Sequence, residues 1–198
     1  MKLLTISGLD IYQDPTDGGV TFSGEACIDA DGSPRAYGPN DTGLDYTANA
    51  GHLGNWWALV TDLSGNPVIQ GEGDPAPGFY VSTTSLVANP LKPKTSPLHW
   101  VNSEEIPYIV VPGPLARAAQ GVVLGCHATI TDSKTRNTIA AVVADIGPAT
   151  HLGEMSIAAA KALGLNHDAK NGGCSEKRFF YTFYPNRPAH GFKLQPLG

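Results

Sequence analysis

Charged residues are scarce in this sequence, and several hallmarks of whole protein classes are missing from it. Asp, Glu, Lys and Arg make up only 16% of the 198 residues, and Lys and Arg form no cluster. With a formal net charge of -5, the chain is not expected to bind nucleic acid or an anionic membrane. No apolar run approaches the ~20 residues that a membrane-spanning helix needs.

Cysteine is rare, and no metal-binding pattern is apparent. The three cysteines, Cys27, Cys126 and Cys174, cannot all pair within one chain, so we expect mostly reduced thiols, with one disulfide still possible. The six histidines show no helical pair or repeated spacing that would indicate zinc. Residues 29–32 resemble the start of a calcium loop, but the twelfth position is Asn40 and not Glu. We therefore expect no metal and no cofactor.

The N-terminus also lacks the features of a secretory leader. Residues 1–8 contain one positive charge and a short apolar run that is broken almost at once. This pattern differs from a Sec signal peptide. Either a leader was trimmed or export uses another route.

What the sequence has in abundance is glycine and proline. The 23 Gly and 16 Pro are spread without a repeat, which favours many turns between short strands. Residues 56–61 and 68–70 read as a hairpin, and four further strands are expected in the second half, at residues 106–111, 121–130, 139–145 and 179–184. One helix is expected at residues 156–163, with Ser156 as its N-cap. We predict one mainly β domain over residues 1–198, a small closed barrel with one short helix and long loops.

Asp145 is the first candidate for chemistry. It ends an apolar strand and is followed by Ile146-Gly147-Pro148, which turns the chain. Partial desolvation there would raise the pKa of the carboxyl group, which suits a general acid near neutral pH. The alternative is a structural Asp that accepts hydrogen bonds from the backbone of its own turn.

Glu154 follows nine residues later, just before the predicted helix. The unpaired N–H groups of a first helical turn would keep its carboxylate ionised, and that could be its whole role. Together, however, one carboxyl pushed toward neutrality and one held charged are what acid/base cleavage of a glycosidic bond requires. His151 lies between the two acids and could tune them.

These residues lie in segments that resemble a known family. Residues 143–148 (Val-Ala-Asp-Ile-Gly-Pro), 153–156 (Gly-Glu-Met-Ser) and 158–164 (Ala-Ala-Ala-Lys-Ala-Leu-Gly) are similar to the signature of the chitosanases of glycoside hydrolase family 75. Further segments match in order at residues 43–51, 55–57, 74–75, 78–82, 106–112 and 171–173, so the resemblance covers roughly residues 25–184. It implies that Asp145 and Glu154 match the two essential acids. It also implies a core related to the double-psi β-barrel and inverting hydrolysis of β-1,4 linkages in chitosan.

Substrate-binding candidates follow from the charge of such a polymer. Glucosamine polymers are cationic when protonated, so acidic subsites are needed beside the catalytic pair, and Asp31 and Asp45 are candidates for them. Asp29 reads at least as well as an ordinary turn former. Trp57 and Tyr46 are candidates for sugar contacts; since neighbours on a strand face opposite sides, at most one of Trp56 and Trp57 should face a cleft.

Two alternatives stay open, because residues 143–148 followed by a small helix also resemble other double-psi barrels. One is an enzyme of phage or effector type that cuts the glycan strands of peptidoglycan. The other is a non-catalytic, expansin-like barrel that binds polysaccharide. In each case we expect a polysaccharide partner, a monomer, and action outside the cell or on the cell wall.

Overall fold

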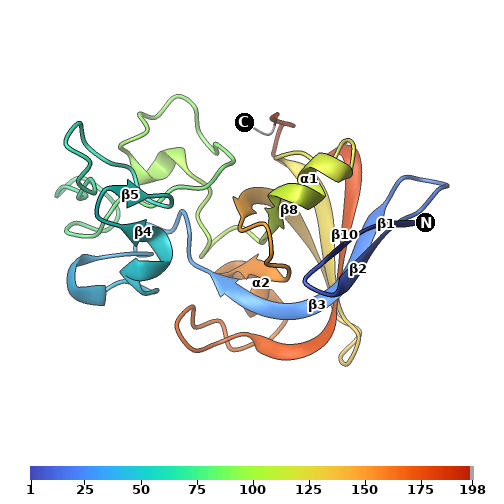
Figure 1. Cartoon of the computed structure of the whole chain (residues 1–198). Helices are drawn as coiled ribbons and strands as arrows, with labels where there is room; N and C mark the ends of the chain where they lie inside the picture. The colour runs from blue at the N-terminus through green and yellow to red at the C-terminus, as the bar shows by residue number, and fades with distance from the viewer. Residues whose placement is uncertain (197–198) are drawn as a thin grey trace.

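The computed structural model describes residues 1–196 and is mainly β, with 38% of residues in strands and 11% in helices. The main strands are β1 (Lys2–Ile6), β2 (Leu9–Gln13), β3 (Val20–Asp29), β6 (Tyr108–Pro112), β7 (Cys126–Asp132), β8 (Thr138–Gly147), β9 (Glu154–Ser156) and β10 (Cys174–Pro188). Two short strands, β4 (Gly51–His52) and β5 (Asn55–Trp56), and two short helices, α1 (Gly113–Ala118) and α2 (Ile157–Ala162), complete the chain with three 3-10 turns, Pro39–Asp41, Thr47–Ala50 and Pro97–His99. Figure 1 shows the barrel on one side and a loop-rich segment on the other.

Six strands close into a barrel. The order β3-β10-β7-β8-β6-β9 returns to β3 through a parallel pairing of β3 with β9, and β6 and β8 are also parallel. The β1–β2 hairpin extends from the edge of β3. The predicted small closed barrel is therefore confirmed, and closure leaves the six barrel strands without a free edge.

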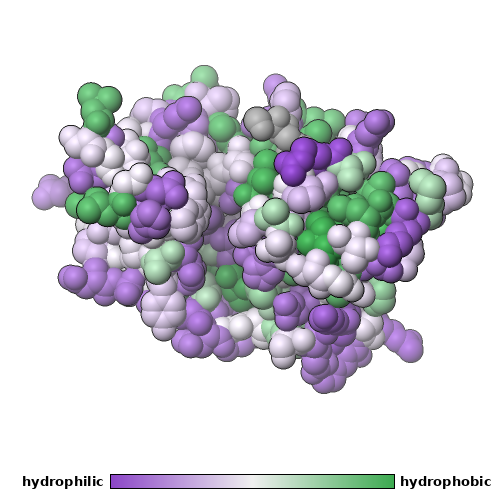
Figure 2. Space-filling view, viewed as in Figure 1, coloured by the Kyte–Doolittle hydropathy of each residue, from purple (hydrophilic) through white to green (hydrophobic). Residues whose placement is uncertain are grey.

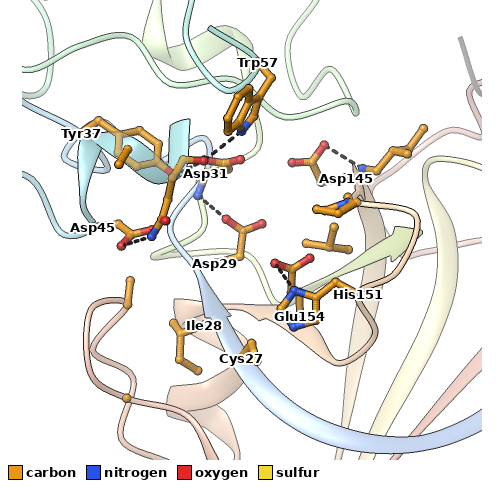
Figure 3. Close-up of a pocket in the computed structure, with 18 residues that line it drawn as sticks. Cys27, Ile28, Asp29, Asp31, Tyr37, Asp45, Trp57, Asp145, His151 and Glu154 are labelled. Carbon is orange, nitrogen blue, oxygen red and sulfur yellow. Dashed lines mark hydrogen bonds and ion pairs between the residues drawn. The ribbon is translucent and has the colours of Figure 1, made fainter. Parts of the chain in front are cut away.

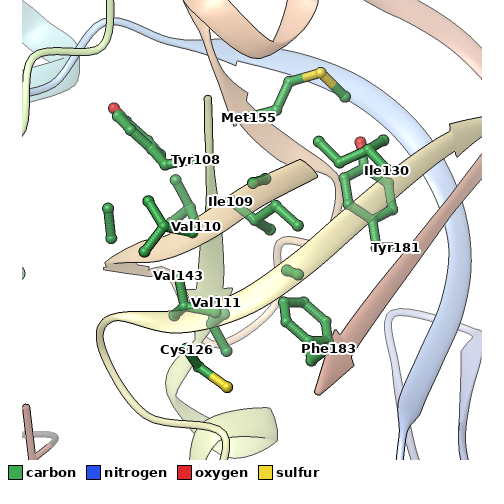
Figure 4. Close-up of a cluster of buried hydrophobic side chains, with 14 of the residues drawn as sticks. Tyr108, Ile109, Val110, Val111, Cys126, Ile130, Val143, Met155, Tyr181 and Phe183 are labelled. Atoms are coloured by element: carbon green, nitrogen blue, oxygen red, sulfur yellow. The ribbon is translucent and has the colours of Figure 1, made fainter. Parts of the chain in front are cut away.

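The barrel is filled by alternate residues of its strands. Along β3, Phe22 and Ala26 are buried whereas their neighbours are partly exposed, which is the two-residue period of a strand with one face on the core. Phe22 stacks on Tyr181 with ring centroids 4.8 Å apart. Figure 4 shows Tyr181, Ile130 and Met155 from three different strands meeting in this interior. Such packing holds the ends of the barrel strands rigidly.

Residues 30–105 lie beside the barrel and contain little regular structure. A second, smaller cluster around Tyr37, Ala50 and Leu59 holds this segment together, and Ile157 of α2 joins it to the barrel. The hairpin predicted for residues 56–70 forms around its turn but not as a pair of regular strands: the Val68 N–H donates to the Val60 carbonyl and the Asp62 N–H to the Asn66 carbonyl, each at 2.8 Å. Only isolated bridges such as Thr61 with Pro67 form, and the strand pair β4–β5 lies just before them. Residues farther along the chain also pair with this segment, since Leu59 bridges Ser82.

The helix prediction was right in one place and incomplete in another. α2 begins after Ser156, whose hydroxyl accepts a hydrogen bond from the Ala159 N–H as an N-cap. The prediction of a single helix missed α1, which starts at Gly113-Pro114; this dipeptide reads as a turn in sequence, yet proline fits the first turn of a helix. Among the described residues, no helix has the length and apolarity to cross a membrane.

Candidate active site

A cavity of about 750 Å³ lies where the barrel meets the loop segment. The surface is hollowed between these two parts in Figure 2. From the barrel side it is lined by Cys27, Ile28, Asp29, Val110, Asp145, Ile146, Gly147, Pro148, His151 and Glu154, and from the other side by Asp31, Tyr37, Asp45, Ala48, Asn49, Trp57, Ala169 and Gly172. Five of the six predicted site residues thus share one cavity; Tyr46 is the exception.

Asp145 lies near the end of β8 and is only 9% exposed. Its Oδ1 accepts three hydrogen bonds, from the Ser85 N–H (2.9 Å), the Ser85 hydroxyl (2.6 Å) and the Ile146 N–H (2.8 Å). Burial raises the pKa of this carboxyl, and the bonds from Ser85 and Ile146 partly oppose that shift. The turn-stabilising role and the raised pKa expected for Asp145 therefore occur together, and Oδ2 is the oxygen left for a proton.

Glu154 begins β9, where it pairs in parallel register with Cys27. Its Oε1 lies 3.5 Å from Nδ1 of His151. Its Oε2 lies over Gly147, where an added Cβ would be 2.8 Å from it. Gly147 therefore leaves the space that the Glu154 carboxylate occupies, and Figure 3 shows this carboxylate beside His151.

The expectation that the helix N-terminus keeps Glu154 charged is wrong. The residue lies in β9, and the first turn of α2 contains no acidic residue. Burial instead raises the pKa of Glu154, with His151 lowering it and the charge of Asp145 raising it further. Burial therefore shifts both acids toward the protonated form. Their protonation differs only through their neighbours, which are Ser85 and Ile146 for Asp145 and His151 for Glu154.

Two more carboxyl groups, Asp29 and Asp31, adjoin Asp145. Asp29 ends β3, and its Oδ1 accepts the Asp31 N–H at 2.8 Å, as expected of a turn former. One carboxyl oxygen from each of Asp29, Asp31 and Asp145 lies within 4.8 Å of the others. Burial and this mutual repulsion raise the pKa of Asp29 and of Asp31 well above the ordinary value. Such a set could also hold a divalent cation, although acidic groups often cluster without one.

Asp45 lines the cavity but is mostly covered by the surrounding residues. It is 4% exposed, and both of its oxygens accept hydrogen bonds from the Asn49 side chain, at 2.9 and 3.0 Å. Burial raises the pKa of Asp45, and the bond from Asn49 opposes this. Asp45 therefore orders the loop and adds charge to the cavity. It exposes little surface for contact with a ligand.

Of the two adjacent tryptophans only one faces the cavity, although Trp57 lies just after β5 and not within the strand. Trp57 lines the cavity, is 60% exposed, and donates its indole N–H to the Asn49 carbonyl at 2.9 Å. Trp56 packs against the smaller hydrophobic cluster instead. Tyr46 lies outside the lining, and the ammonium of Lys170 covers its ring at 5.1 Å from the centroid.

Sequence reasoning missed several residues that complete the site. Ser85 holds Asp145, yet nothing in its local sequence indicates this, because the contact depends on Leu86 donating its N–H to the Ala144 carbonyl of β8. Tyr37 donates its hydroxyl to Asp31 at 2.7 Å, which only the loop fold reveals. For Cys27 the sequence predicts a mostly reduced thiol and no place in the site, whereas alternation along β3 places it beside Glu25 on the outer face.

The cavity is acidic overall. Its lining includes five carboxyl groups, and among these lining residues there is no Lys or Arg. No model of a protein family matches the chain, and no curated protein shows significant similarity to it.

Proposed function

We propose that the protein is a glycoside hydrolase that cleaves β-1,4 linkages inside chitosan-type glucosamine polymers. The observation that supports this best is the composition of the cavity, in which Asp145 and Glu154 from the barrel face an open space with acidic and aromatic groups opposite them. Glycosidic cleavage by most such enzymes needs two carboxyl groups flanking the bond. The resemblance to glycoside hydrolase family 75 assigns the same pair.

In the proposed reaction Asp145 is the general acid. Its Oδ1 is occupied by three donors, so the proton resides on Oδ2 and is delivered to the oxygen of the leaving sugar. Burial raises the pKa of Asp145, which keeps this proton available at mildly acidic pH. Ser85 is a positioning residue because it fixes the rotation of the carboxyl group.

Glu154 is the proposed general base. Its carboxylate removes a proton from a water molecule as that water attacks the anomeric carbon. Nδ1 of His151, 3.5 Å from Oε1 of Glu154, helps to orient the carboxylate. Attack from the opposite face inverts the configuration of that carbon. This mechanism requires a carboxyl separation of about 6.5 to 9.5 Å, so that a water fits between base and sugar.

The charge of the cavity favours a cationic polymer. With five carboxyl groups and no Lys or Arg in the lining, a protonated amine relieves repulsion among Asp29, Asp31 and Asp145. A polymer bearing carboxylates, such as the muramic acid units of peptidoglycan, adds to that repulsion. The proposed substrate implies action outside the cell or on a cell wall, by a monomer.

The deciding experiment compares two polymers with one protein preparation. We expect purified protein to release oligosaccharides from partly deacetylated chitosan, with the α-anomer formed first, and to leave purified peptidoglycan intact. Clearing of peptidoglycan with no products from chitosan would replace the substrate by a cell-wall glycan. Binding of either polymer without new reducing ends would replace the enzyme by a carbohydrate-binding barrel.

A further inference from the structure

A second group of side chains lies beside Glu154, on the outer face of the barrel. Glu25 and Cys27 are two positions apart on β3, so they point the same way, while their neighbour Ala26 is buried in the interior. The loop between β8 and β9 places His151 over them. One donor atom from each of Glu25, Cys27 and His151 lies within 4.8 Å of the others.

The chemistry of these donors is that of a transition-metal site. A thiolate, an imidazole and a carboxylate form the mixed sulfur, nitrogen and oxygen set that zinc prefers, whereas calcium and magnesium take oxygen donors. Cys27 and His151 both line the cavity, so a fourth coordination position would be open to it. Three protein ligands with one open position suit a readily exchanged ion.

The local charge also favours a cation. Cys27 is a free thiol, and Glu25 forms no salt bridge within residues 1–196. Burial, with the negative charges of Glu25 and Glu154, raises the pKa of Cys27 to about 11. A bound cation would neutralise the negative charges of Glu25 and Glu154, and the thiol proton of Cys27 would pass to solvent.

The group of Glu25, Cys27 and His151 adjoins Glu154, the proposed base of the reaction. His151 lies 3.5 Å from the Glu154 carboxylate, and Cys27 is its register partner between β3 and β9 (Figure 3). We propose that Glu25, Cys27 and His151 bind a thiophilic divalent cation such as Zn²⁺, and that its binding reversibly inhibits hydrolysis. The metal withdraws His151 from Glu154, so the Glu154 carboxylate loses the neighbour that orients it toward the attacking water. The inhibitory half rests on the proposed function, whereas metal binding does not.

Cobalt titration tests the site without any catalytic assay. We expect Co²⁺ to bind one per chain and to produce a thiolate-to-cobalt charge-transfer band in the near ultraviolet. Cys27→Ser should abolish the band, and Glu25→Gln should weaken binding about tenfold or more. Cys174→Ser, which removes another half-buried thiol, should retain both. Binding without the band, a band that persists in Cys27→Ser, or no binding at all would each overturn the site.

Zinc inhibition tests the consequence. We expect Zn²⁺ to inhibit chitosan hydrolysis by the wild-type protein and a chelator to restore it, with Glu25→Gln needing about tenfold more zinc. Zinc that binds by calorimetry but leaves hydrolysis unchanged would overturn the inhibition and leave the site standing. A protein that gives the cobalt band but never cleaves chitosan would refute the proposed function and not the metal site.

Discussion

The two walls of the cavity are built in opposite ways. On the barrel wall, Asp145 and Glu154 project from strands whose backbones are fixed by pairing on both sides. On the loop wall, Asp31, Asp45 and Trp57 lie in a segment held by isolated bridges and side-chain hydrogen bonds. Regular strands can hold reacting groups to within fractions of an ångström, whereas loops supply charge and contact area. We therefore expect changes in the barrel wall to affect turnover and changes in the loop wall to affect binding.

The largest expected effect is on the barrel wall itself. Asp145→Asn and Glu154→Gln should each lower kcat on chitosan by about 10² to 10⁴-fold, because each removes one proton-transfer group. Product release measured as reducing ends checks this, with circular dichroism to verify folding. The exposed Glu72→Gln serves as the matched control and should retain full activity. Near wild-type turnover in either acid variant would make the mechanism wrong.

Gly147→Ala should displace both Glu154 and Val110. The new Cβ would lie 2.8 Å from Oε2 of Glu154 and 2.7 Å from Val110, so the carboxylate must move. A displacement of this kind costs up to about 10²-fold in kcat. Gly73→Ala is the control, since a Cβ there meets nothing within 4 Å. Equal kinetics of the two variants would show that the position of Glu154 is not critical.

Trp57→Ala addresses the loop wall. Since Trp57 is exposed and lines the cavity, we expect its loss to raise KM by about 3- to 10-fold with little change in kcat. Trp56→Phe is the matched comparison. Trp56 packs on the smaller cluster, so that variant should lower the melting temperature and leave KM unchanged. A fall in kcat for Trp57→Ala would remove the distinction between the walls.

The smallest expected effect is on the free energy of unfolding. It concerns Asp29, which lies where the barrel wall and the loop wall of the cavity meet. Burial and the neighbouring Asp145 raise the pKa of Asp29 in the folded chain. Between the ordinary and the raised pKa, the folded chain binds more protons than the unfolded chain, so this contribution to stability is present at low pH and lost as pH rises. Asp29→Asn should therefore be more stable than the wild type at neutral pH, by about 1 kcal/mol.

Thermal unfolding across pH measures this difference. The gain in stability of Asp29→Asn should vanish below about pH 4, where Asp29 of the wild type is protonated in both the folded and the unfolded chain. Asp62→Asn is the control, because Asp62 is exposed and backbone and side-chain hydrogen bonds from Asn66 lower its pKa. That variant should gain nothing at neutral pH. A wild-type stability that rises with pH through this range, unchanged in Asp29→Asn, would contradict the repulsion among the three carboxyl groups.

The amino-acid sequence alone predicted part of the barrel wall. Alternation along β3 and β10, the continuous apolar run of β8 and the Ser156 cap are local signals, and reading them requires no knowledge of distant residues. The same signals placed Asp145 at a strand end. They misplaced the electrostatics of Glu154, since its distance from the helix and its burial depend on how β9 pairs with β3 and β6.

Tertiary structure decided the rest. Ser85 meets Asp145 only when the loop segment docks on the barrel, Tyr37 meets Asp31 only when that segment folds, and His151 meets Cys27 only when β9 pairs with β3. Within residues 56–82 the sequence predicted the local pairing around Thr61 and Pro67, but not the bridges to more distant residues such as Leu59 with Ser82. Burial is a property of the whole fold, and burial is the main cause of the raised pKa values at this site. The sequence determined which acids the cavity contains, and the packing of distant segments determined their protonation.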